Sequence, residues 1–428
     1  MDNKKGDLFA LASIPLIMTL GNSMLIPVLP LIAKEIGISS FQVSMLITVY
    51  GIVAILLIPI AGYLSDRFGR KVVIIPSLII AGVGGAICGV ADWFANGMTV
   101  YWIILGGRFL QGIGAAGAFP IVIPLVGDMF ESEEQVSHGL GIIETSNTFG
   151  KVLSPILGAL LGAWIWYVPF LAIPVLCIIS LILVIFMVKE PEHKEPPQLK
   201  QFLGSVKAVF KDKGRWLYAI FIIGGICMFL LFGVLFYLSE KLETSFNLQG
   251  VVKGLVLAIP LAVLCLASYF TGRWIGENKP LMKWLGVIGL VLATAALFGV
   301  SFFSQIYFVI ACLVVCGLGI GMVLPSSDAL ITEGIEKKLR GTITSIYSSM
   351  RFIGVALGPP VISLLMQTSH ATMFSVIGAV SLIGVLLLLF MVKPEPDDKG
   401  EKKSKGNTKG NAKGTQKRSV ATSKPRLQ

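Results

Sequence analysis

The sequence predicts an all-α integral membrane protein, with about twelve transmembrane helices in two pseudo-symmetric six-helix bundles around a central cavity. Three observations lead to this fold class. The chain of 428 residues is 55% hydrophobic and only 14% charged, with a mean hydropathy of +0.83. Apolar runs long enough to cross a bilayer recur along most of the chain. Two stretches of the first half reappear in the second half at nearly the same separation.

The apolar runs are continuous rather than alternating, which favours helices over a transmembrane barrel. A helix needs about 20 residues to cross the hydrocarbon core. The first run is too long for a signal-peptide core and no convincing cleavage site follows it, so the first span should stay in the mature protein. In chain order, the predicted spans cover residues 8–33, 41–63, 72–92, 99–127, 138–163, 166–188, 215–238, 250–273, 284–303, 306–331, 341–366 and 372–392.

The internal repeat supports two halves of six spans each. The stretch "QGIGAAGAFP" at residues 111–120 aligns with "CGLGIGMVLP" at residues 316–325. The stretch "GKVLSPILG" from Gly150 aligns with "GVALGPPVI" from Gly354 at almost the same separation. Matches in successive spans indicate a duplicated six-helix unit, as in many secondary transporters.

The domain organisation follows from the repeat and from two polar segments. A charged, Pro-bearing connector has apolar residues at helical spacing, which predicts a short amphipathic helix at the membrane surface or between domains. The C-terminal tail lacks large apolar residues and should be disordered, with contact to anionic lipid as the alternative. The predicted units are an N-terminal bundle (1–188), a cytoplasmic linker (189–214), a C-terminal bundle (215–393) and a basic tail (394–428).

The basic residues of the short loops predict the orientation in the membrane. One side receives nearly all of them, whereas the other side has little beyond Lys34 and Lys241. Both termini are therefore expected in the cytoplasm, and this pattern, with the near absence of glycosylation, disulfide and organelle-targeting signals, suits a bacterial plasma membrane. The net charge of +11 follows from this topology and from the tail, so it requires no nucleic-acid partner.

Three motifs stand on this scaffold. The loop "GYLSDRFGRK" between spans two and three holds Gly62, Asp66, Arg67, Gly69, Arg70 and Lys71. Span four holds "RFLQGIGAAG", with Arg108 and Gln111. Span five holds Gly141, Gly150, Ser154, Pro155 and Gly158.

These motifs resemble those of the major facilitator superfamily. The loop closely resembles the superfamily's loop signature, and the span-four stretch is similar to its basic fourth-helix motif. The span-five pattern is similar to the antiporter motif of the drug:proton antiporter branch, with Ser-Pro and Gly-Ala where that motif has Gly-Pro and Gly-Gly. The resemblance extends over nearly the whole chain except the tail. It implies a monomeric secondary transporter that exports small molecules by proton antiport and alternating access, without a cofactor.

The same resemblance implies a cytoplasmic gate in the loop at residues 62–71. Asp66 would meet the N-terminal end of span eleven, and Arg70 would reach Asp128 after span four. Because partly exposed ion pairs are each worth little, they could latch the transporter without freezing it. The alternative treats these residues as ordinary positive-inside charges, which leaves Asp66 unexplained.

Ionisable groups inside spans are costly and indicate function by default. Glu144 and Lys151 lie two turns apart on one face of span five, and Arg108 and Arg351 also lie within spans. We expect them to face the cavity; the alternative is that they form purely structural ion pairs. Glu144 is predicted to carry the proton, with Asp328 second, because a partly desolvated carboxylate beside a cation readily changes its proton affinity. The resemblance implies that Arg108 tunes it.

The excess of cations over acids in these spans favours an anionic or zwitterionic amphiphile, such as a catecholate siderophore or an acidic drug. Aromatic side chains would also suit flat apolar compounds, so a broad multidrug pump remains open. The residues predicted to line the cavity are Asn22, Tyr50, Gln111, Asn147, Phe149, Lys151, Trp166 and Arg351.

Two other functions remain possible on this fold: uptake of a small solute by symport, and a non-pumping lipid scramblase or receptor. All six cysteines fall inside predicted spans and are expected to be packing residues. No metal-ligand spacing, nucleophilic triad or phosphate-binding loop is recognisable, so the sequence predicts no enzyme, no metal site and no cofactor. The expected partners are the bilayer, a small-molecule substrate and protons.

Overall fold

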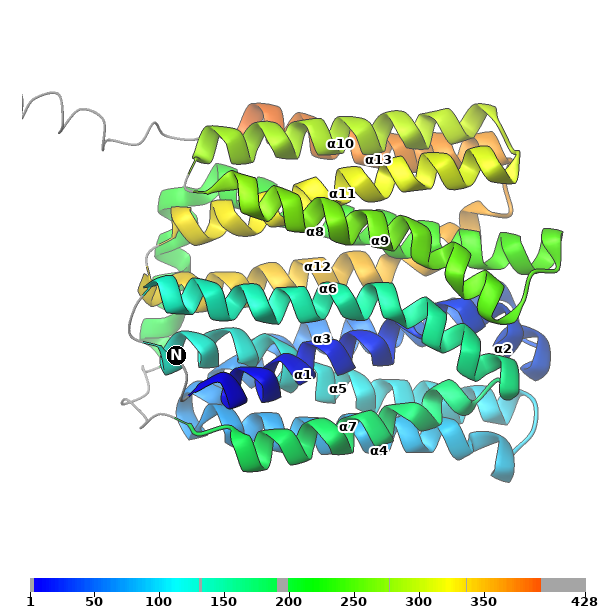
Figure 1. Ribbon diagram of the computed structural model, residues 1–428, viewed down its shortest axis with the longest axis horizontal. Coiled ribbons are helices and arrows are strands. Elements are labelled where there is room, and N and C mark those ends of the chain that lie inside the picture. Colours follow the sequence, from blue (N-terminus) through cyan, green and yellow to red (C-terminus); the bar gives the residue numbers. More distant parts are fainter. Residues whose placement is uncertain (1–3, 131–132, 191–198, 277, 336, 394–428) are drawn as a thin grey trace, which may run out of the picture. The chain divides into compact units, whose positions relative to one another are not determined.

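The protein forms a bundle of long helices that run roughly along one common direction (Figure 1). The computed structural model describes residues 4–130, 133–190, 199–276, 278–335 and 337–393. Every regular element in these ranges is a helix, which confirms the predicted all-α fold. The predicted basic tail, 394–428, lies outside the described residues.

The elements follow the predicted spans closely. In chain order they are α1 (Lys5–Ser23), η2 (Ile26–Val28), α2 (Leu29–Ile36), α3 (Ser40–Phe68), α4 (Arg70–Phe94), α5 (Met98–Met129), α6 (Glu133–Trp164), α7 (Val168–Met187), α8 (Leu199–Phe246), α9 (Gly250–Ile275), α10 (Lys279–Phe302), α11 (Ile306–Gly334), α12 (Lys337–Leu365) and α13 (His370–Met391).

Eleven helical segments of the described chain are long and apolar enough to cross a membrane. The fifth predicted span, α6, is not among them, although it has 32 residues like α5. Its middle carries Glu144, Asn147 and Lys151. Polar groups inside a span face the protein interior or a cavity. Thus α6 is a membrane helix whose polar face is turned inward.

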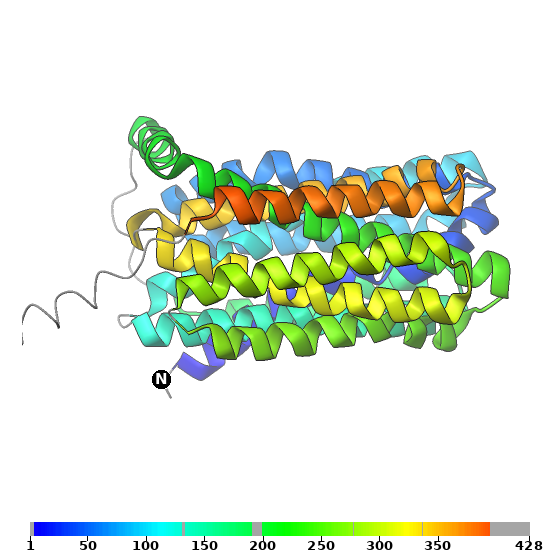
Figure 2. The same cartoon turned by 90° about the horizontal axis from the view of Figure 1, so that it is seen from above.

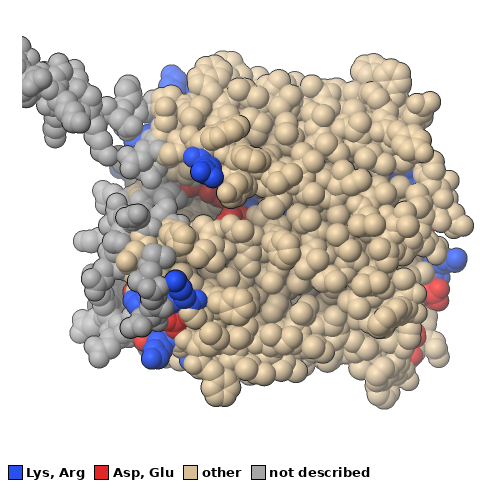
Figure 3. Space-filling view, in the orientation of Figure 1, with Lys and Arg blue, Asp and Glu red and all other residues tan. Residues whose placement is uncertain are grey.

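The outer surface fits a bilayer. Figure 3 shows a broad belt without charged side chains between two ends that carry them. Large aromatic residues near the helix ends are exposed, among them Trp93, Trp164, Trp274 and Trp284. Tryptophan is enriched where membrane meets water. The molecule is therefore a multi-pass membrane protein.

The two halves repeat the same helix contacts. Helix α4 packs on α5 as α10 packs on α11, and α4 packs on α7 as α10 packs on α13. Likewise α1 packs on α6 as α8 packs on α12. Between the halves, α3 contacts α12 and α6 contacts α9, which is again a corresponding pair. The predicted repeat thus has a counterpart in the packing, whereas the exact domain boundaries stay a prediction.

The repeated glycines have the same task in both halves. A Cβ atom at Gly112 would lie 2.7 Å from the carbonyl oxygen of Tyr50, and one at Gly317 would lie 2.4 Å from that of Pro260. These glycines bring α5 against α3 and α11 against α9. Small residues permit such close approach of membrane helices. The sequence match therefore reflects backbone packing rather than chemistry.

The first predicted span is broken in the structure. Helix α1 ends at Ser23, and α2 starts only at Leu29, after the short η2 element. Pro27 and Pro30 have no backbone N–H and therefore interrupt the helical hydrogen bonds. Carbonyl oxygens near the break become free to accept hydrogen bonds from other helices.

The predicted linker does not end before span seven. Helix α8 runs from Leu199 to Phe246, so the expected boundary at residue 215 lies inside one helical element. Figure 2 shows that the first turns of α8 point in a different direction from the rest of the helix. The apolar face expected at residues 199–210 falls mostly on side chains outside the described ones.

The packing of α6 on the broken helix gives a first prediction. A Cβ atom at Gly158 would lie 1.9 Å from the carbonyl oxygen of Met24, a contact that no side-chain movement can relieve. We expect Gly158→Ala to lower the free energy of unfolding by about 3 kcal/mol or more, at the upper end for overpacking. Thermal unfolding in detergent would measure the change.

Gly141 is the matched control, because it lies in the same helix and motif with no atom within 4 Å of its Cβ position. Gly141→Ala should be neutral or slightly stabilising, by up to about 1 kcal/mol. Equal stability of the two variants would contradict the packing described for Gly158.

Candidate functional site in a cavity between the two halves

A cavity with about 580 Å³ of empty space lies between the two halves. The first half contributes Met18, Thr19, Asn22, Ser23, Tyr50, Phe119, Asn147 and Lys151. The second half contributes Met228, Phe232, Ser348, Arg351, Phe352 and Val355. Polar groups and aromatic rings therefore line the same cavity, as the binding of an amphiphile would require.

One arginine stands between two carboxylates at this site. Nη2 of Arg351 lies 4.0 Å from Oε1 of Glu144, and Nη1 lies 3.8 Å from Oδ1 of Asp328. Glu144 comes from α6 of the first half, whereas the other two residues come from α11 and α12 of the second half. Their side chains are 43% and 35% exposed for Glu144 and Asp328, but only 15% for Arg351. Both acids are thus accessible to solvent and protons.

Glu144 is held in place by its neighbours on the first half. The amide nitrogen of Asn147 donates to both carboxylate oxygens, at 3.1 and 3.2 Å. Thr19 donates to the amide oxygen of Asn147 at 2.6 Å. These hydrogen bonds hold the Glu144 carboxylate facing Arg351. They also use both the oxygen and the NH₂ group of the Asn147 amide.

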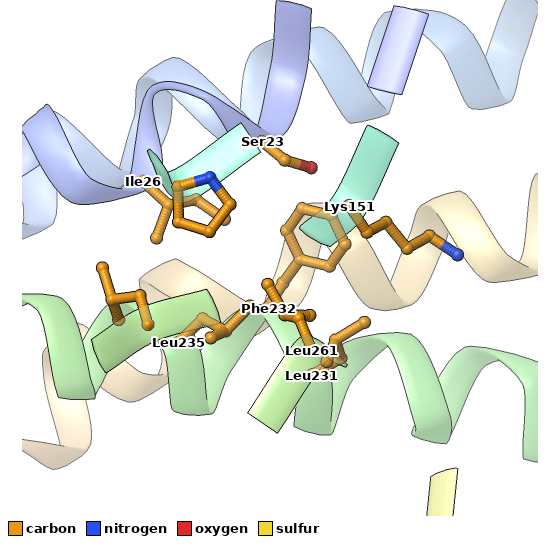
Figure 4. Close-up of a pocket in the computed structure, with 9 residues that line it drawn as sticks. Ser23, Ile26, Lys151, Leu231, Phe232, Leu235 and Leu261 are labelled. Carbon is orange, nitrogen blue, oxygen red and sulfur yellow. The ribbon is translucent and has the colours of Figure 1, made fainter. Parts of the chain in front are cut away.

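Lys151 is buried in the cavity wall without a partner. The residue is 7% exposed, and within the described ranges its ammonium group has no hydrogen bond and no ion pair. Figure 4 shows the side chain extending away from Ile26 and Leu235, which lie on the other side of a small apolar pocket. An unpaired buried cation carries a desolvation cost. An anion in the cavity would offset that cost.

Arg108 lies behind the cavity wall and is fully buried. It donates to the carbonyl oxygen of Leu46 at 2.7 Å, to Oε1 of Gln111 at 2.6 Å and to Oδ1 of Asn22 at 2.5 Å. Its guanidinium also lies 4.5 Å from the centre of the Tyr50 ring. Glu144 is not among its described contacts, so any influence on that acid has to pass through other residues.

The structure brings together most of the predicted cavity residues but not all. Asn22, Tyr50, Asn147, Lys151 and Arg351 line the cavity as expected. Three others do not, contrary to the prediction: Phe149, Trp166 and Gln111. Phe149 is 54% exposed on the outside of α6, Trp166 packs against Tyr167 after α6, and Gln111 is buried beside Arg108.

Sequence reasoning missed several lining residues. Thr19 and Met18 lie one turn before Asn22 and therefore share its face, which the helical period could have indicated. Phe352 follows Arg351 directly in the sequence. Phe119 and Phe232 are uncharged, so nothing in the sequence indicates that they line a cavity. An aromatic residue in a span packs equally well against lipid or a cavity, so no pattern singles these out.

The end of the bundle opposite the N-terminus is held closed by bonds between the halves. Lys253 of α9 donates to the carbonyl oxygen of Pro27 at 2.7 Å and pairs with Glu243 of α8 at 2.6 Å. Ser239 donates to the carbonyl oxygen of Ile26 at 2.8 Å. The acceptors Ile26 and Pro27 are the carbonyls freed by the break in the first span. We call Lys253, Glu243 and Ser239, with these two carbonyls, the far-end latch.

The other end is more open. Figure 3 shows charged side chains at the base of a recess that lies toward the N-terminal end of the bundle. The exposed fractions of Glu144 and Asp328 agree with access from this side. The structure therefore represents a state that is closed at the far end.

The loop between α3 and α4 carries the predicted gate residues. Arg70 pairs with Asp66 and, through Nε, with Asp128 at 3.2 Å, so the expected ion pair between Arg70 and Asp128 is present. Gly69 joins the two helices with φ of +113°, a conformation that favours glycine. Gly62 has open space around it, and Arg67 lies over the Phe68 ring. The partner expected for Asp66 at the start of span eleven falls on side chains outside the described ones.

Glu190 is a further partner of this loop that the sequence did not reveal. Its carboxylate accepts the backbone N–H groups of Arg70 and Lys71 at the start of α4, where the helix dipole favours an anion. The side chain of Lys71 donates to the carbonyl oxygens of Ile185 and Val188, both at 2.8 Å. These bonds tie α4 to the end of α7 within the first half.

The residues of the span-five motif pack α6 against α1. A Cβ atom at Gly150 would lie 3.2 Å from the carbonyl oxygen of Leu16. Ser154 is buried, and its hydroxyl donates a hydrogen bond to the carbonyl oxygen of Gly150, at 2.6 Å. On another side, the carbonyl oxygen of Pro155 lies 2.5 Å from the Cβ position of Gly254 in α9. The motif thus sets how closely α6 approaches α1 and the second half.

Two repeated helix sets around a charged cavity define a secondary membrane transporter. Comparison with known proteins agrees. A family model described as Major Facilitator Superfamily matches residues 11–359 and 282–426. A Bacillus subtilis protein named bacillibactin exporter is 53% identical over 402 residues, which cover 94% of this chain and 99% of that relative. The multidrug efflux protein YfmO of the same species is 28% identical over 391 residues, covering 89% and 92%.

A tetracycline resistance protein of class C from Escherichia coli is 28% identical over 370 residues, covering 82% of this chain and 87% of that relative. Among solved structures, a D-xylose-proton symporter has a TM-score of 0.76 at 12% identity, covering 91% and 98%. A human organic anion transporter has a TM-score of 0.69 at 17% identity, covering 90% and 99%. These two structures show the fold alone.

The chain belongs to the major facilitator superfamily. With its relatives among drug and siderophore exporters, it is an efflux transporter of the drug:proton antiporter type.

Proposed function

We propose that the protein exports an anionic amphiphile of the siderophore type across the bacterial plasma membrane in exchange for protons. The observation that carries this proposal is the charge arrangement of the site, where Arg351 stands between Glu144 and Asp328 while Lys151 has no partner among the described residues. The relative named bacillibactin exporter, at 53% identity, supports a siderophore as cargo.

Proton exchange follows from the position of Glu144 across the boundary between the halves. Its cation partner, Arg351, belongs to the other half, so rocking of the halves changes their separation. A carboxylate that loses a nearby cation gains affinity for protons. A proton on Glu144 weakens its attraction to Arg351 and favours separation. In this scheme Glu144 carries the proton, and Asp328 keeps Arg351 in place.

The substrate charge follows from Lys151, the cavity cation that has no partner among the described residues, while Arg351 lies beside two acids. Lys151 shares the cavity with Tyr50, Phe119 and Phe352. An anion on an aromatic scaffold would pair with Lys151 and place its rings against these side chains. A cationic drug would instead add to the unpaired positive charge.

The loop charges favour a cytoplasmic position for both termini. In that orientation the far-end latch would lie on the outer side, and the arrangement would correspond to an inward-facing state of a transporter that acts as a monomer. Alternating access would open this latch and close the recess at the N-terminal end.

Transport by inside-out membrane vesicles tests the proposal. Vesicles acidified inside should accumulate fluorescein, an anionic dye, and should discriminate against a cationic rhodamine with the same xanthene ring. Lys151→Gln should lower the apparent affinity for fluorescein about tenfold, equivalent to about 1.4 kcal/mol, because it removes the cation and keeps a polar group. The initial uptake rate at varied dye concentration is the measurement.

Lys34→Gln is the control, because Lys34 is exposed on α2. Uptake that survives collapse of the proton gradient would contradict proton exchange. Preference for rhodamine that Lys151→Gln leaves unchanged would contradict the anionic substrate.

A further inference from the structure

We propose that Asn22 and Lys151 together form the subsite for the substrate's oxyanion, and that Arg108 positions Asn22 by turning its amide N–H groups into the cavity. The inference rests on the proposed function and assigns the atoms that would bind the anionic group.

The orientation of Asn22 follows from donor chemistry. Arg108 has only hydrogen-bond donors, so the Asn22 atom 2.5 Å from its Nη2 has to be the amide oxygen. The NH₂ group then occupies the opposite corner of the amide. Asn22 is 5% exposed and lines the cavity, and its NH₂ group has no hydrogen-bond partner in the described part of the chain. Two N–H donors are therefore available to a ligand.

The arginine that imposes this orientation is itself immobile. Its other donors are bound to Leu46, Gln111 and the carbonyl oxygen of Gly21, and its face lies against Tyr50. No carboxylate neutralises Arg108 among the residues that the structure describes. The charge therefore polarises the Asn22 amide and strengthens its N–H groups as donors toward the cavity.

Lys151 supplies the charge of the subsite. It lines the same cavity as Asn22 and is also more than nine-tenths buried. Arg351 cannot serve in the same way, because it is already shared by Glu144 and Asp328. Asn147 is unsuitable because its NH₂ group is bound to Glu144 and its oxygen accepts from Thr19. Asn22 and Lys151 therefore offer their donors from the first-half wall made by α1 and α6.

The donor set selects the ligand chemistry. An ammonium group and a neutral amide suit an oxyanion with two oxygen acceptors, such as a carboxylate or a singly ionised catechol. The carboxylates beside Arg351 are not part of this subsite. Substrate and proton would then bind to different side chains.

Gln111 provides a matched comparison. Its oxygen also accepts from Arg108, at 2.6 Å, but its NH₂ group is buried with no hydrogen-bond partner among the described residues, and the residue is not among those that line this cavity. Asn22→Asp and Gln111→Glu therefore place the same new charge against the same guanidinium. Only the first of them also replaces donors that face the cavity.

Equilibrium binding of fluorescein and of the cationic rhodamine to detergent-solubilised protein, followed by fluorescence polarisation, tests the subsite. Asn22→Asp should raise the Kd for fluorescein about tenfold or more, a loss of about 1.4 kcal/mol, and should leave or lower the Kd for rhodamine. Gln111→Glu should change either Kd by less than about threefold, which is about 0.65 kcal/mol. Arg108→Met frees the amide to turn and should reduce fluorescein binding selectively.

The outcomes are separable. Equal effects of Asn22→Asp and Gln111→Glu, or a parallel loss of both dyes in Arg108→Met, would overturn the subsite and leave the proposed function standing. Fluorescein binding that depends on Lys151 but not on Asn22 would overturn the role of Asn22. Absence of fluorescein binding to the unaltered protein would overturn the anionic substrate itself.

Discussion

Glu144→Gln is expected to abolish the dependence of export on the proton gradient, while the dye still binds. The amide keeps the size of the side chain and one of the two oxygen acceptors for Asn147, but it cannot take up a proton or form an ion pair with Arg351. The two halves then lose the ion pair that proton binding would control. Uptake by vesicles with and without an acidic interior would measure the effect, and the two rates should become equal.

Two variants frame this result. Glu144→Asp retains an ionisable group and should retain a gradient-dependent rate, whereas Glu35→Gln alters an exposed carboxylate on α2 and should behave as the unaltered protein. Loss of gradient dependence in Asp328→Asn but not in Glu144→Gln would move the proton-carrying role to Asp328, on the other side of Arg351.

Lys253→Met is expected to open the far end. The lysine is 1% exposed and is bonded to Glu243 and to the carbonyl oxygen of Pro27. Removing one partner of a buried ion pair costs about 3–5 kcal/mol. A change of about 5.5 kcal/mol moves a two-state equilibrium from 1:99 to 99:1, so the variant should shift much of the population.

Alkylation of Ser23→Cys by a membrane-impermeant maleimide added at the far end would report the opening. Ser23 lines the cavity and the small apolar pocket beside it, so the new thiol should react much faster when Lys253→Met is also present. Lys34→Met is the control, because that lysine is exposed on α2. Equal reaction rates would show that the far-end latch does not hold the closed state.

Periodicity accounts for part of the arrangement at the site. Glu144 and Lys151 are predicted on one face of α6 because they lie two turns apart. In the structure Lys151 and Arg351 line the cavity, and Glu144 lies 4.0 Å from Arg351. The same period could have excluded Phe149, which precedes Lys151 by two residues and thus lies about 200° around the helix. Its 54% exposure agrees with that angle.

Other features of the site and the fold could not be predicted from the pattern of side chains along the sequence. Lys253 binds a backbone carbonyl, and nothing in the sequence marks which carbonyl becomes free. Arg108 was assigned to tune Glu144, yet its described contacts are to amides, carbonyls and a ring. Its partners lie on different helices, so only their packing reveals them. The linker was predicted as a separate element, because helical spacing does not show where one helix passes into the next.

The acceptors of the far-end latch are main-chain oxygens of Ile26 and Pro27. Substitution at Ile26 changes a side chain but leaves the oxygen in the chain, whereas substitution of Pro27 could also restore helical hydrogen bonds at the break. The side chains of the latch come from Lys253, Glu243 and Ser239. Mutations that change how readily the transporter reaches its outward-facing state are therefore expected mainly in the second half, because the first half contributes main-chain acceptors to the latch.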